Sequence, residues 1–522
     1  MAPVPASLSS PPPSPTARYR GRTSTGPFSL MVALSVCCAA YVYIWSGLMA
    51  GGDARIDAAN ARLLKADITI IGAGLAGLSA SVEAAAAAPD AKIVLIEREA
   101  KVGGNSAKAS SGINAAISED DAPVFEQDTL KSGGGLSNSF LVDVFVKQSP
   151  SAIDFLQQCE VDLSVLCQLG GHSNKRTHRN KSGPNVGFAI ISALQKKVAQ
   201  LSNVEIITGA TAKKIEVEPS TGRVLGLYIE KEDGEAVAIE SSAVILATGG
   251  FSANRNLLKR FAPGLEAFPT TNGACAQGDG VLMAEALGAD LILMDKVQLH
   301  PTGFINPKDR NAQQKFLAPE AIRGSGALLF NSSGKRFVNE LSTRDVVSQA
   351  ILAQPTKSSF LWLFEGAQPL QSSLGFYKHI GLVKAVNSVR EAAEYCHFDA
   401  NDMLQELNEY AAIAAGNKPD PFGKTVFPFP LHHIDAVDSP VEIHVMEVAP
   451  AVHYTMGGVK INTDTAVLRA DGSPIDGLFA AGEVSGGLHG ANRLGGNSLA
   501  ECVVFGRIAG QHAVKHALQR RA

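Results

Sequence analysis

The feature that most constrains the fold of this chain is a glycine-rich turn between an apolar strand and a helix. Residues 67–88 read DITIIGAGLAGLSASVEAAAAA, in which Gly72, Gly74 and Gly77 form the pattern G-x-G-x-x-G. Glu97 ends the apolar part of the next strand pattern, 20 residues after Gly77. Such glycines let a pyrophosphate approach the helix N-terminus closely, and an acid at this distance accepts hydrogen bonds from a ribose. The pattern therefore predicts a Rossmann-like α/β domain that binds a dinucleotide.

Three further glycine-rich segments predict that this dinucleotide is FAD. They are KVGGNSAKASSGINAA (101–116), ILATGGF (245–251) and GLFAAGEVSGGLHGANRLGGNSLAE (477–501). Any one of them is equally compatible with a simple turn. Together they offer more backbone and donor groups than a nicotinamide nucleotide needs, and they suit an FAD that lies extended across the domain. The predicted FAD-binding residues are Gly72, Gly74, Ala76, Gly77, Glu97, Gly104, Asn105, Ser106, Ser111, Gly112, Ala210, Thr248, Gly249, Asp279, Glu483, Arg493, Ser498 and Leu499.

Residues 306–440 interrupt this cofactor-binding pattern. They contain no G-x-G-x-x-G, are rich in loops, and include a helical pattern at 402–415. Strand patterns return at GVKINTDTAVLRADGSPIDGLFAAGE (458–483). We therefore expect an FAD-binding domain in two segments, 64–305 and 441–515, with an α+β domain inserted at 306–440.

The beginning of the chain has a different composition. Residues 1–27 are rich in Pro, Ser and Arg and contain no acid, which predicts a disordered leader. Residues 28–51 carry no charge and are long enough for a transmembrane or signal-anchor helix, with a buried soluble helix as the alternative. Arginines before this run and Asp53 after it favour a cytosolic N-terminus, with the catalytic part in the endoplasmic reticulum lumen. The leader also fits a mitochondrial presequence followed by an inner-membrane sorting segment, so both locations stay open.

Charge and cysteine usage argue against several other classes of protein. The formal net charge is −4 with both signs interspersed, which gives no electrostatic footprint for nucleic acid. None of the seven cysteines forms C-x-x-C or C-x-x-C-H. We therefore expect no metal site, and specifically no structural zinc, c-type haem or cysteine-ligated iron–sulfur cluster.

Five longer motifs carry a family resemblance. They are QLHPTG (298–303), EAIRGSGALLFNSSGKRFVNE (320–340), STRDVVSQA (342–350), HYTMGG (453–458) and GLHGANRLGGNSLAE (487–501). In this combination the chain resembles the flavoprotein subunit family of fumarate reductases and succinate dehydrogenases, and most of all its soluble single-subunit fumarate reductases from fungi and other eukaryotes. The resemblance covers about residues 64–515. It implies an FAD domain of the GR2 type whose inserted domain is a cap that closes over the active site.

The resemblance also implies a substrate site. Fumarate is a planar dianion, and an arginine with neighbouring donor side chains suits each of its carboxylates. By resemblance, Arg493 and His453 hold one carboxylate and His300 holds the other, with Gly112 and Gly496 also against the substrate.

The chemistry implied by the resemblance is hydride and proton transfer. Hydride passes from N5 of reduced flavin to one alkene carbon, and Arg344 gives a proton to the other, which yields succinate. Glu320 and Arg323, three residues apart, return the proton to Arg344.

Several features depart from the family pattern. Members of membrane complexes carry a histidine that binds FAD covalently, whereas Ser106 stands in the matching segment, so we expect one non-covalent FAD per chain. Pro319 precedes Glu320 where several relatives have a substrate-binding threonine, and Tyr454 replaces a second histidine. No haem- or iron–sulfur-binding motif occurs in this chain, so the expected electron donor is a diffusible one such as FADH2, FMNH2 or NADH, or else an unidentified partner.

Three other functions are compatible with parts of these motifs. They are an amino-acid oxidase of the L-aspartate type, a reductase of another 2-enoate, and an FAD-binding membrane protein without turnover. The two-carboxylate set and the intact proton-relay residues favour fumarate as the substrate.

Overall fold

The computed structural model describes residues 61–364 and 371–521, and for 371–373 it describes the backbone only. The expected leader and the uncharged segment 28–51 lie outside these residues. Within the described ranges, no helix combines the length and the apolar character that a membrane span requires. The described residues form one compact unit.

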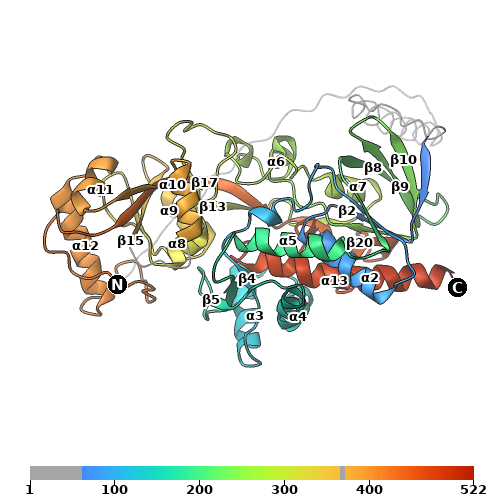
Figure 1. Ribbon diagram of the computed structural model, residues 1–522, viewed down its shortest axis with the longest axis horizontal. Coiled ribbons are helices and arrows are strands. Elements are labelled where there is room, and N and C mark those ends of the chain that lie inside the picture. Colours follow the sequence, from blue (N-terminus) through green and yellow to red (C-terminus); the bar gives the residue numbers. More distant parts are fainter. Residues whose placement is uncertain (1–60, 365–370, 522) are drawn as a thin grey trace, which may run out of the picture. The chain divides into compact units, whose positions relative to one another are not determined.

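A mostly parallel sheet forms the centre of the region predicted to bind FAD (Figure 1). From one edge to the other its strands are β19 (Ala466–Leu468), β20 (Pro474–Ala480), β11 (Ala243–Leu246), β2 (Ile68–Ile71), β3 (Ile93–Ile96) and β7 (Val204–Ile207). Only β19 pairs antiparallel to its neighbour. Every residue of β2, β3 and β11 is buried, as is typical of parallel strands that are covered on both faces. The predicted α/β class is confirmed, and strands from both ends of the sequence share one sheet.

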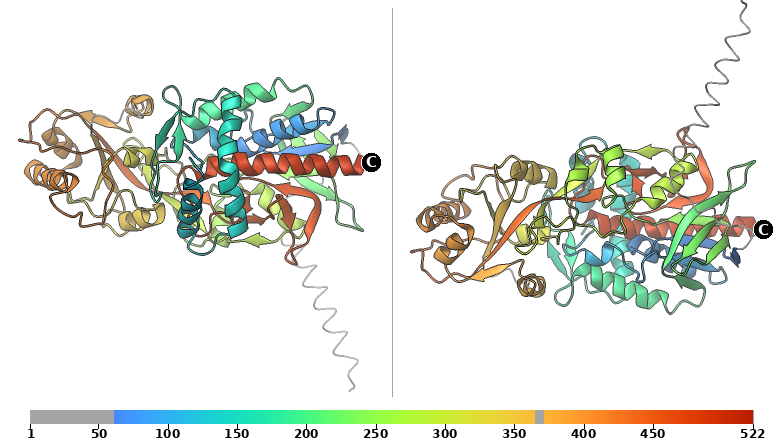
Figure 2. Two further views of the ribbon diagram at one scale, coloured as in Figure 1. Left: turned by 90° about the horizontal axis from the view of Figure 1, so that it is seen from below. Right: turned by 90° about the horizontal axis from the view of Figure 1, so that it is seen from above.

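Three helices that lie beside this sheet are α2 (Leu75–Ala87), α5 (Val186–Val198) and α13 (Asn497–Arg521). Helices α2 and α13 lie side by side (Figures 1 and 2) and approach backbone to backbone. A Cβ atom at Gly506 would lie 2.5 Å from the carbonyl oxygen of Ala76, and one at Gly510 would lie 2.6 Å from that of Ala80. Side chains larger than hydrogen at these two positions would therefore force the helices apart.

Smaller sheets and helices surround the central sheet. A four-stranded sheet contains β1 (Arg62–Lys65), β10 (Ala236–Glu240), β9 (Val224–Lys231) and β8 (Ala210–Val217). Two three-stranded sheets contain β12 (Leu291–Ile292), β18 (Gly458–Lys460) and β21 (Ser485–Gly486), and β4 (Ile113–Asn114), β6 (Thr177–Arg179) and β5 (Val165–Cys167). The helices here are α3 (Asp121–Ser132), α4 (Ser139–Gln158), α6 (Arg255–Phe261) and α7 (Asp279–Ala286), with short 3-10 turns at Ser106–Lys108 and Leu265–Ala267.

A five-stranded antiparallel sheet organises the region of the expected inserted domain (Figure 1, left). Its strands are β13 (Val297–Phe304), β17 (Ile443–Thr455), β15 (Ser359–Phe364), β14 (Leu328–Phe330) and β16 (Lys384–Val386). The helices are α8 (Glu320–Gly324), α9 (Arg344–Leu352), α10 (Gln371–His379), α11 (Val389–Cys396) and α12 (Ala400–Ala414). Two apolar clusters of its own lie against this sheet. Because β13 and β17 lie just outside 306–440, the sheet begins before the expected domain boundary and ends after it. Strand β17 contains His453.

Candidate active site

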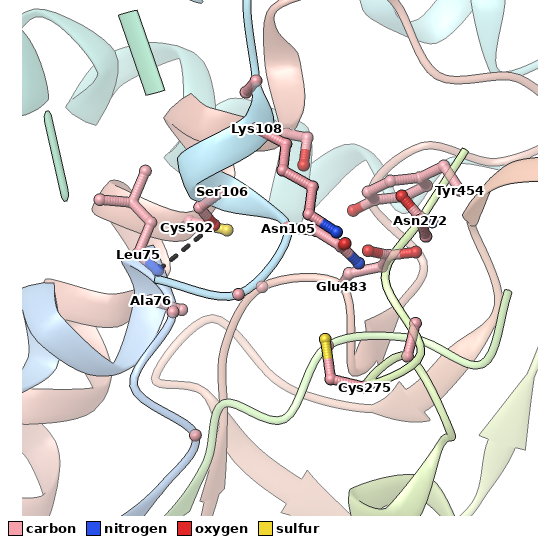
Figure 3. A pocket seen from close by; sticks show the side chains of 18 of the residues that line it. Leu75, Ala76, Asn105, Ser106, Lys108, Asn272, Cys275, Tyr454, Glu483 and Cys502 are labelled. Atoms are coloured by element: carbon pink, nitrogen blue, oxygen red, sulfur yellow. Dashed lines mark hydrogen bonds between the residues drawn. The ribbon is translucent and has the colours of Figure 1, made fainter. Parts of the chain in front are cut away.

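A cavity of about 560 Å³ opens where the glycine-rich turns meet the five-stranded sheet. In Figure 3, Leu75, Ala76, Ser106 and Cys502 lie on one side of it, and Asn105, Asn272, Tyr454 and Glu483 gather on the other. Of the residues predicted from the sequence, those that line the cavity are Gly72, Gly74, Ala76, Glu97, Gly104, Asn105, Ser106, Ser111, Gly112, Ala210, Thr248, Gly249, Asp279, Arg344, His453, Glu483, Arg493, Gly496, Ser498 and Leu499. The four that do not line it are Gly77, His300, Glu320 and Arg323.

The G-x-G-x-x-G turn lies between β2 and α2, and its first two glycines line this cavity. Gly72 has a φ of +102°, and a Cβ there would lie 2.4 Å from the Ala247 carbonyl oxygen. Around Gly74, by contrast, the nearest atom to such a Cβ is 3.8 Å away, so the backbone is open to a ligand. Gly77 serves packing instead, because its Cβ would lie 1.9 Å from the Gly72 carbonyl oxygen. A bare turn that leads into α2 suits a pyrophosphate.

The acid after β3 is held to this turn. Ala73 donates its backbone N–H to Oε2 of Glu97 at 2.9 Å, and Glu99 donates its own to Oε1 at 2.9 Å. These bonds keep the carboxylate beside the turn while it still lines the cavity. Ser106 is tied to the same turn, since its Oγ accepts the N–H of Leu75 at 3.3 Å (Figure 3).

Three other residues predicted to contact the cofactor differ in their hydrogen-bond and ion-pair partners. The buried hydroxyl of Thr248 has no hydrogen-bond partner among the described residues. Asp279 forms an ion pair with Arg98, and both line the cavity. Glu483 accepts the N–H of Thr455 at 3.0 Å, and burial raises the pKa of Glu483 to about 7. An orphaned hydroxyl, open glycine turns and a ribose-type acid together fit a bound dinucleotide.

The residues predicted to relay a proton form a continuous buried row next to the cavity. Arg344 donates from Nε to Oε2 of Glu320 at 2.7 Å, and Arg323 lies 3.9 Å from Oε1 of the same carboxylate. Gly170 donates its N–H to Oε1 at 2.9 Å. Burial alone would raise the pKa of Glu320, but the charges of Arg344 and Arg323 lower this pKa to about 2. The carboxylate is therefore ionised between two guanidinium groups.

Two histidines lie together in the same buried region. The rings of His300 and His453 are 5.0 Å apart between centroids. Burial, and then the charge of Arg344, lower the pKa of both well below its usual range, so both rings are neutral. The backbone N–H of Thr302 donates to Nδ1 of His300, which leaves the hydrogen on Nε2. That Nε2 has no hydrogen-bond partner among the described residues, although it is a buried donor.

Arg493 is buried without a carboxylate partner in the described part of the chain. Its guanidinium lies over the ring of Tyr454, 4.4 Å from the centroid, and the Tyr454 hydroxyl donates to Glu501 at 2.5 Å. Burial, and then the charge of Arg344, lower the pKa of Arg493 to about 10, so it still carries its charge at neutral pH.

Formal charges in this cluster do not cancel. Arg323, Arg344 and Arg493 face the ionised carboxylate of Glu320, so these four residues together carry a formal charge of +2. Glu483, whose pKa is about 7, offsets only part of this charge beside Arg493 at neutral pH. A buried cluster of this charge favours a dianionic ligand.

Gln298 connects the two halves of the site and had no role in the sequence interpretation. Its Oε1 accepts from Arg344 at 3.0 Å, while its Nε2 donates to the carbonyl oxygen of Arg493 at 2.7 Å and to Asn492 at 2.8 Å. The residue lies in the QLHPTG motif, but an uncharged amide gives little signal in a sequence. Lys108, Asn272 and Cys275 also line the cavity without having been predicted.

Comparison with known proteins gives concordant results. The family model described as "FAD binding domain" matches residues 67–499. Fumarate reductase 1 of Saccharomyces cerevisiae is 40% identical over 85% of this chain and 97% of its own length. An NADH:fumarate oxidoreductase of Klebsiella pneumoniae is 35% identical over 86% of this chain, which spans only about half (48%) of that relative. The solved open conformation of a flavocytochrome c3 fumarate reductase has a TM-score of 0.71 and 33% identity, and the match covers 89% of this chain and 80% of that structure.

Proposed function

Since this chain belongs to the FAD-binding family of fumarate reductase flavoproteins, we propose that it reduces fumarate to succinate. The observation that carries the proposal is the buried +2 cluster beside the cofactor cavity, in which Arg493 has no carboxylate partner among the described residues. A dicarboxylate would neutralise this cluster, whereas a neutral or singly charged substrate would leave part of it uncompensated.

FAD is the cofactor of this family, and one non-covalent FAD per chain would supply the hydride. The turn around Gly74 and the N-terminus of α2 suit its pyrophosphate, and Glu97 suits a ribose. Thr248 and the backbone of Gly249, which has no atom near its open face, would contact other parts of the molecule.

Two sets of side chains would hold the substrate. Arg493 offers charge-assisted hydrogen bonds to one carboxylate, and His453 offers a neutral ring nitrogen beside it. His300 offers the unpartnered Nε2–H to the other carboxylate. Because both histidines are neutral, the fixed charge comes from the arginines, so the site would bind dianions over a wide pH range.

Arg344 would give the second hydrogen. Reduction of fumarate needs one hydride and one proton, and these two together make succinate. A guanidinium donates a proton only if the proton is replaced at once, and Glu320 is placed for this at 2.7 Å from Nε of Arg344. Arg323 would in turn restore the proton to Glu320.

We propose a diffusible electron donor, which is reduced flavin or NADH, and a membrane anchor at residues 28–51. The uncharged length of that segment supports the anchor. Extraction of the full-length protein by carbonate at high pH, without detergent, would contradict the anchor. Activity with NADH alone, without added flavin, would assign NADH as the donor.

The decisive experiment is fumarate-dependent oxidation of reduced viologen by the full-length, FAD-loaded protein. We expect turnover with fumarate, none for Arg344→Ala despite retained FAD, and normal turnover for Arg390→Ala, which breaks an exposed ion pair with Asp438. An FAD-loaded wild-type protein that leaves viologen reduced would overturn the proposal. Peroxide release with aspartate would support an oxidase of the L-aspartate type instead.

A further inference from the structure

Behind the loop that carries Arg493 lies a buried polar cluster that the proposed reaction does not use. Its members are His172, Arg176, Asp121 and Asp128, and all four are buried. His172 and Arg176 lie between β5 and β6, and the two aspartates lie on α3. None of the four lines the cofactor cavity. Any role of the cluster in catalysis must therefore act through a residue that it contacts.

The hydrogen bonds of this cluster fix which nitrogen of His172 carries the hydrogen. Nη1 of Arg176 lies 3.0 Å from Nδ1 of His172. A guanidinium only donates, so Nδ1 must accept, and the hydrogen of the neutral ring stands on Nε2. Nε2 lies 3.0 Å from the carbonyl oxygen of Gly495, to which it donates, and 3.2 Å from Nδ2 of Asn114, which donates to the same oxygen. The ring is neutral because burial, and then the Arg176 charge, lower the pKa of His172 to about 4.

Two aspartates keep Arg176 in the position that this arrangement requires. Asp121 accepts from Nε at 3.1 Å and from Nη2 at 2.7 Å, and Asp128 accepts from Nη1 at 2.6 Å. Although burial alone would raise it, the pKa of Asp121 is lowered by hydrogen bonds from Arg176 and Asn174. The two aspartates therefore compensate the charge of Arg176. What Arg176 contributes to His172 is a hydrogen bond that fixes the orientation of the ring.

The contact point, Gly495, lies directly against the proton relay. A Cβ at Gly495 would be 2.6 Å from Oε2 of Glu320, so the loop and the relay carboxylate touch. Two residues earlier, the carbonyl oxygen of Arg493 accepts from Gln298 at 2.7 Å. The turn from Arg493 to Gly495 is thus held at both ends, by Gln298 at the first and by His172 at the second. Asn114 adds a bond to the Gly495 carbonyl oxygen at 2.7 Å.

We infer that His172 is a positioning residue for the substrate site, which sets the turn of Arg493 and Gly495 against the dicarboxylate and against Glu320. The inference rests on the proposed function for its catalytic consequence. Its structural part does not depend on the substrate, because the bond from His172 to Gly495 is intramolecular. Without this donor, the Gly495 carbonyl oxygen would keep only Asn114, and the turn could move toward or away from Glu320.

The test compares three variants of the full-length, FAD-loaded protein. His172→Leu removes the donor. His172→Gln keeps an N–H near the position of Nε2. His178→Leu is the matched control, because His178 is a half-buried histidine on the same small sheet whose ring contacts only the Leu163 carbonyl oxygen among the bonds described. All three are measured for FAD content, for kcat and KM with fumarate, and for amide hydrogen exchange of residues 489–501.

We expect His172→Leu to lower kcat/KM by about 10- to 100-fold, as misplacement of a reacting group by about 1 Å does. Hydrogen exchange of residues 489–501 should become faster in the same variant, while FAD content stays that of the wild type. His172→Gln should recover most of both effects, and His178→Leu should show neither. A merely structural role would lower thermal stability equally in His172→Leu and His172→Gln, without separating them in kcat/KM.

The inference is overturned if residues 489–501 exchange equally in His172→Leu and the wild type, or if His172→Leu matches His178→Leu in kcat/KM. Loss of FAD from His172→Leu would also overturn it, because the residue would then act on cofactor binding. If the wild type does not reduce fumarate at all, the proposed function fails, and the exchange measurement still decides whether His172 holds the loop.

Discussion

Two buried clusters of arginine differ in how their charge is balanced. In the five-stranded region, Arg336 contacts Glu340 at 2.9 Å and Asp420 at 2.8 Å, and Lys424 contacts Glu340 at 2.9 Å. Two cations thus face two anions. Burial alone would lower the pKa of Arg336, but its two carboxylate partners raise it. At the cavity, burial and a neighbouring arginine lower the pKa of Arg493 to about 10.

The difference separates a structural use of buried charge from a ligand-binding use. Arg336 is satisfied by its own chain, so removal of either side leaves an isolated buried charge. Arg493 is satisfied only in part, by stacking on Tyr454 and by one bond to the Leu494 carbonyl oxygen at 3.1 Å. On the proposed function, an anionic ligand would relieve this unfavourable electrostatic energy.

The largest expected difference between the two arginine clusters is in catalytic turnover. Arg493→Met should lower kcat/KM for fumarate by about 10³-fold or more, because it removes the charge-assisted hydrogen bonds to one carboxylate. Arg336→Met should leave kcat/KM within about threefold of wild type at temperatures where it is folded, because Arg336 does not line the cavity. Steady-state oxidation of reduced viologen measures both. Similar losses in the two variants would mean that the clusters do not differ in function.

In the free energy of unfolding we expect the opposite order, with Arg336→Met the more strongly affected variant. Arg336→Met should lower the free energy of unfolding by about 3–5 kcal/mol, because Glu340 and Asp420 lose a shared partner in a buried place. Arg493→Met should cost less than about 1 kcal/mol without ligand, or stabilise, because it removes a partly compensated charge. Urea unfolding followed by fluorescence measures both free energies. Equal destabilisation would remove the distinction.

A dicarboxylate ligand should stabilise the folded protein only when the arginine cluster at the cavity is intact. Succinate at 100 times its Kd should stabilise the FAD-loaded wild type by about 2.7 kcal/mol, by mass action alone. This gain should disappear in Arg493→Met at the same succinate concentration. Scanning calorimetry with and without succinate measures the change in Tm, and a monovalent acid such as acetate is the control. An equal shift with acetate would contradict a dianion site.

Lowering the pH should reduce the stability of the folded protein through the two histidines of the cavity cluster, His300 and His453. The pKa values of His300 and His453 lie well below that of an unfolded histidine, near 6.5. Below pH 6.5 the unfolded chain therefore binds more protons than the folded one, and stability falls as the pH is lowered, by up to about 1.4 kcal/mol per pH unit for each ring. His453→Gln should reduce this slope in urea titrations between pH 6.5 and 5. An unchanged slope would mean that the ring is protonated in the folded state.

Sequence reasoning reached the parts of the site that are local in the chain. A strand, a bare turn and a helix follow one another within residues 68–87, so the pattern of Gly72 and Gly74 predicts the phosphate site directly. The predicted α/β class and the FAD cofactor are confirmed in the same way. The roles assigned to Arg344, Glu320 and Arg493 came from motif resemblance and stay predictions, although the structure brings the three together.

Hydrogen bonds between uncharged groups that are far apart in the sequence could not be predicted from the sequence. Gln298 reaches Arg493 across 195 residues, and His172 reaches Gly495 across 323. Neither an amide nor a single histidine signals such a partner, because the bond depends on how β13, β6 and α13 come together. Gly77 shows the reverse case: its motif position suggested a cofactor contact, whereas the structure uses it to pack α2 against the turn.

The close contact between α2 and α13 has a consequence for how the protein is made. These helices are over 400 residues apart in sequence, and no side chain fits between them at Gly506 and Gly510. Strand β2 and the glycine-rich turn that follows it therefore leave the ribosome long before α13 does. During that interval the apolar face of α2 is open to chaperones or to premature association. The part of the cavity wall that Ser498, Leu499 and Cys502 provide therefore forms only after α13 has been synthesised.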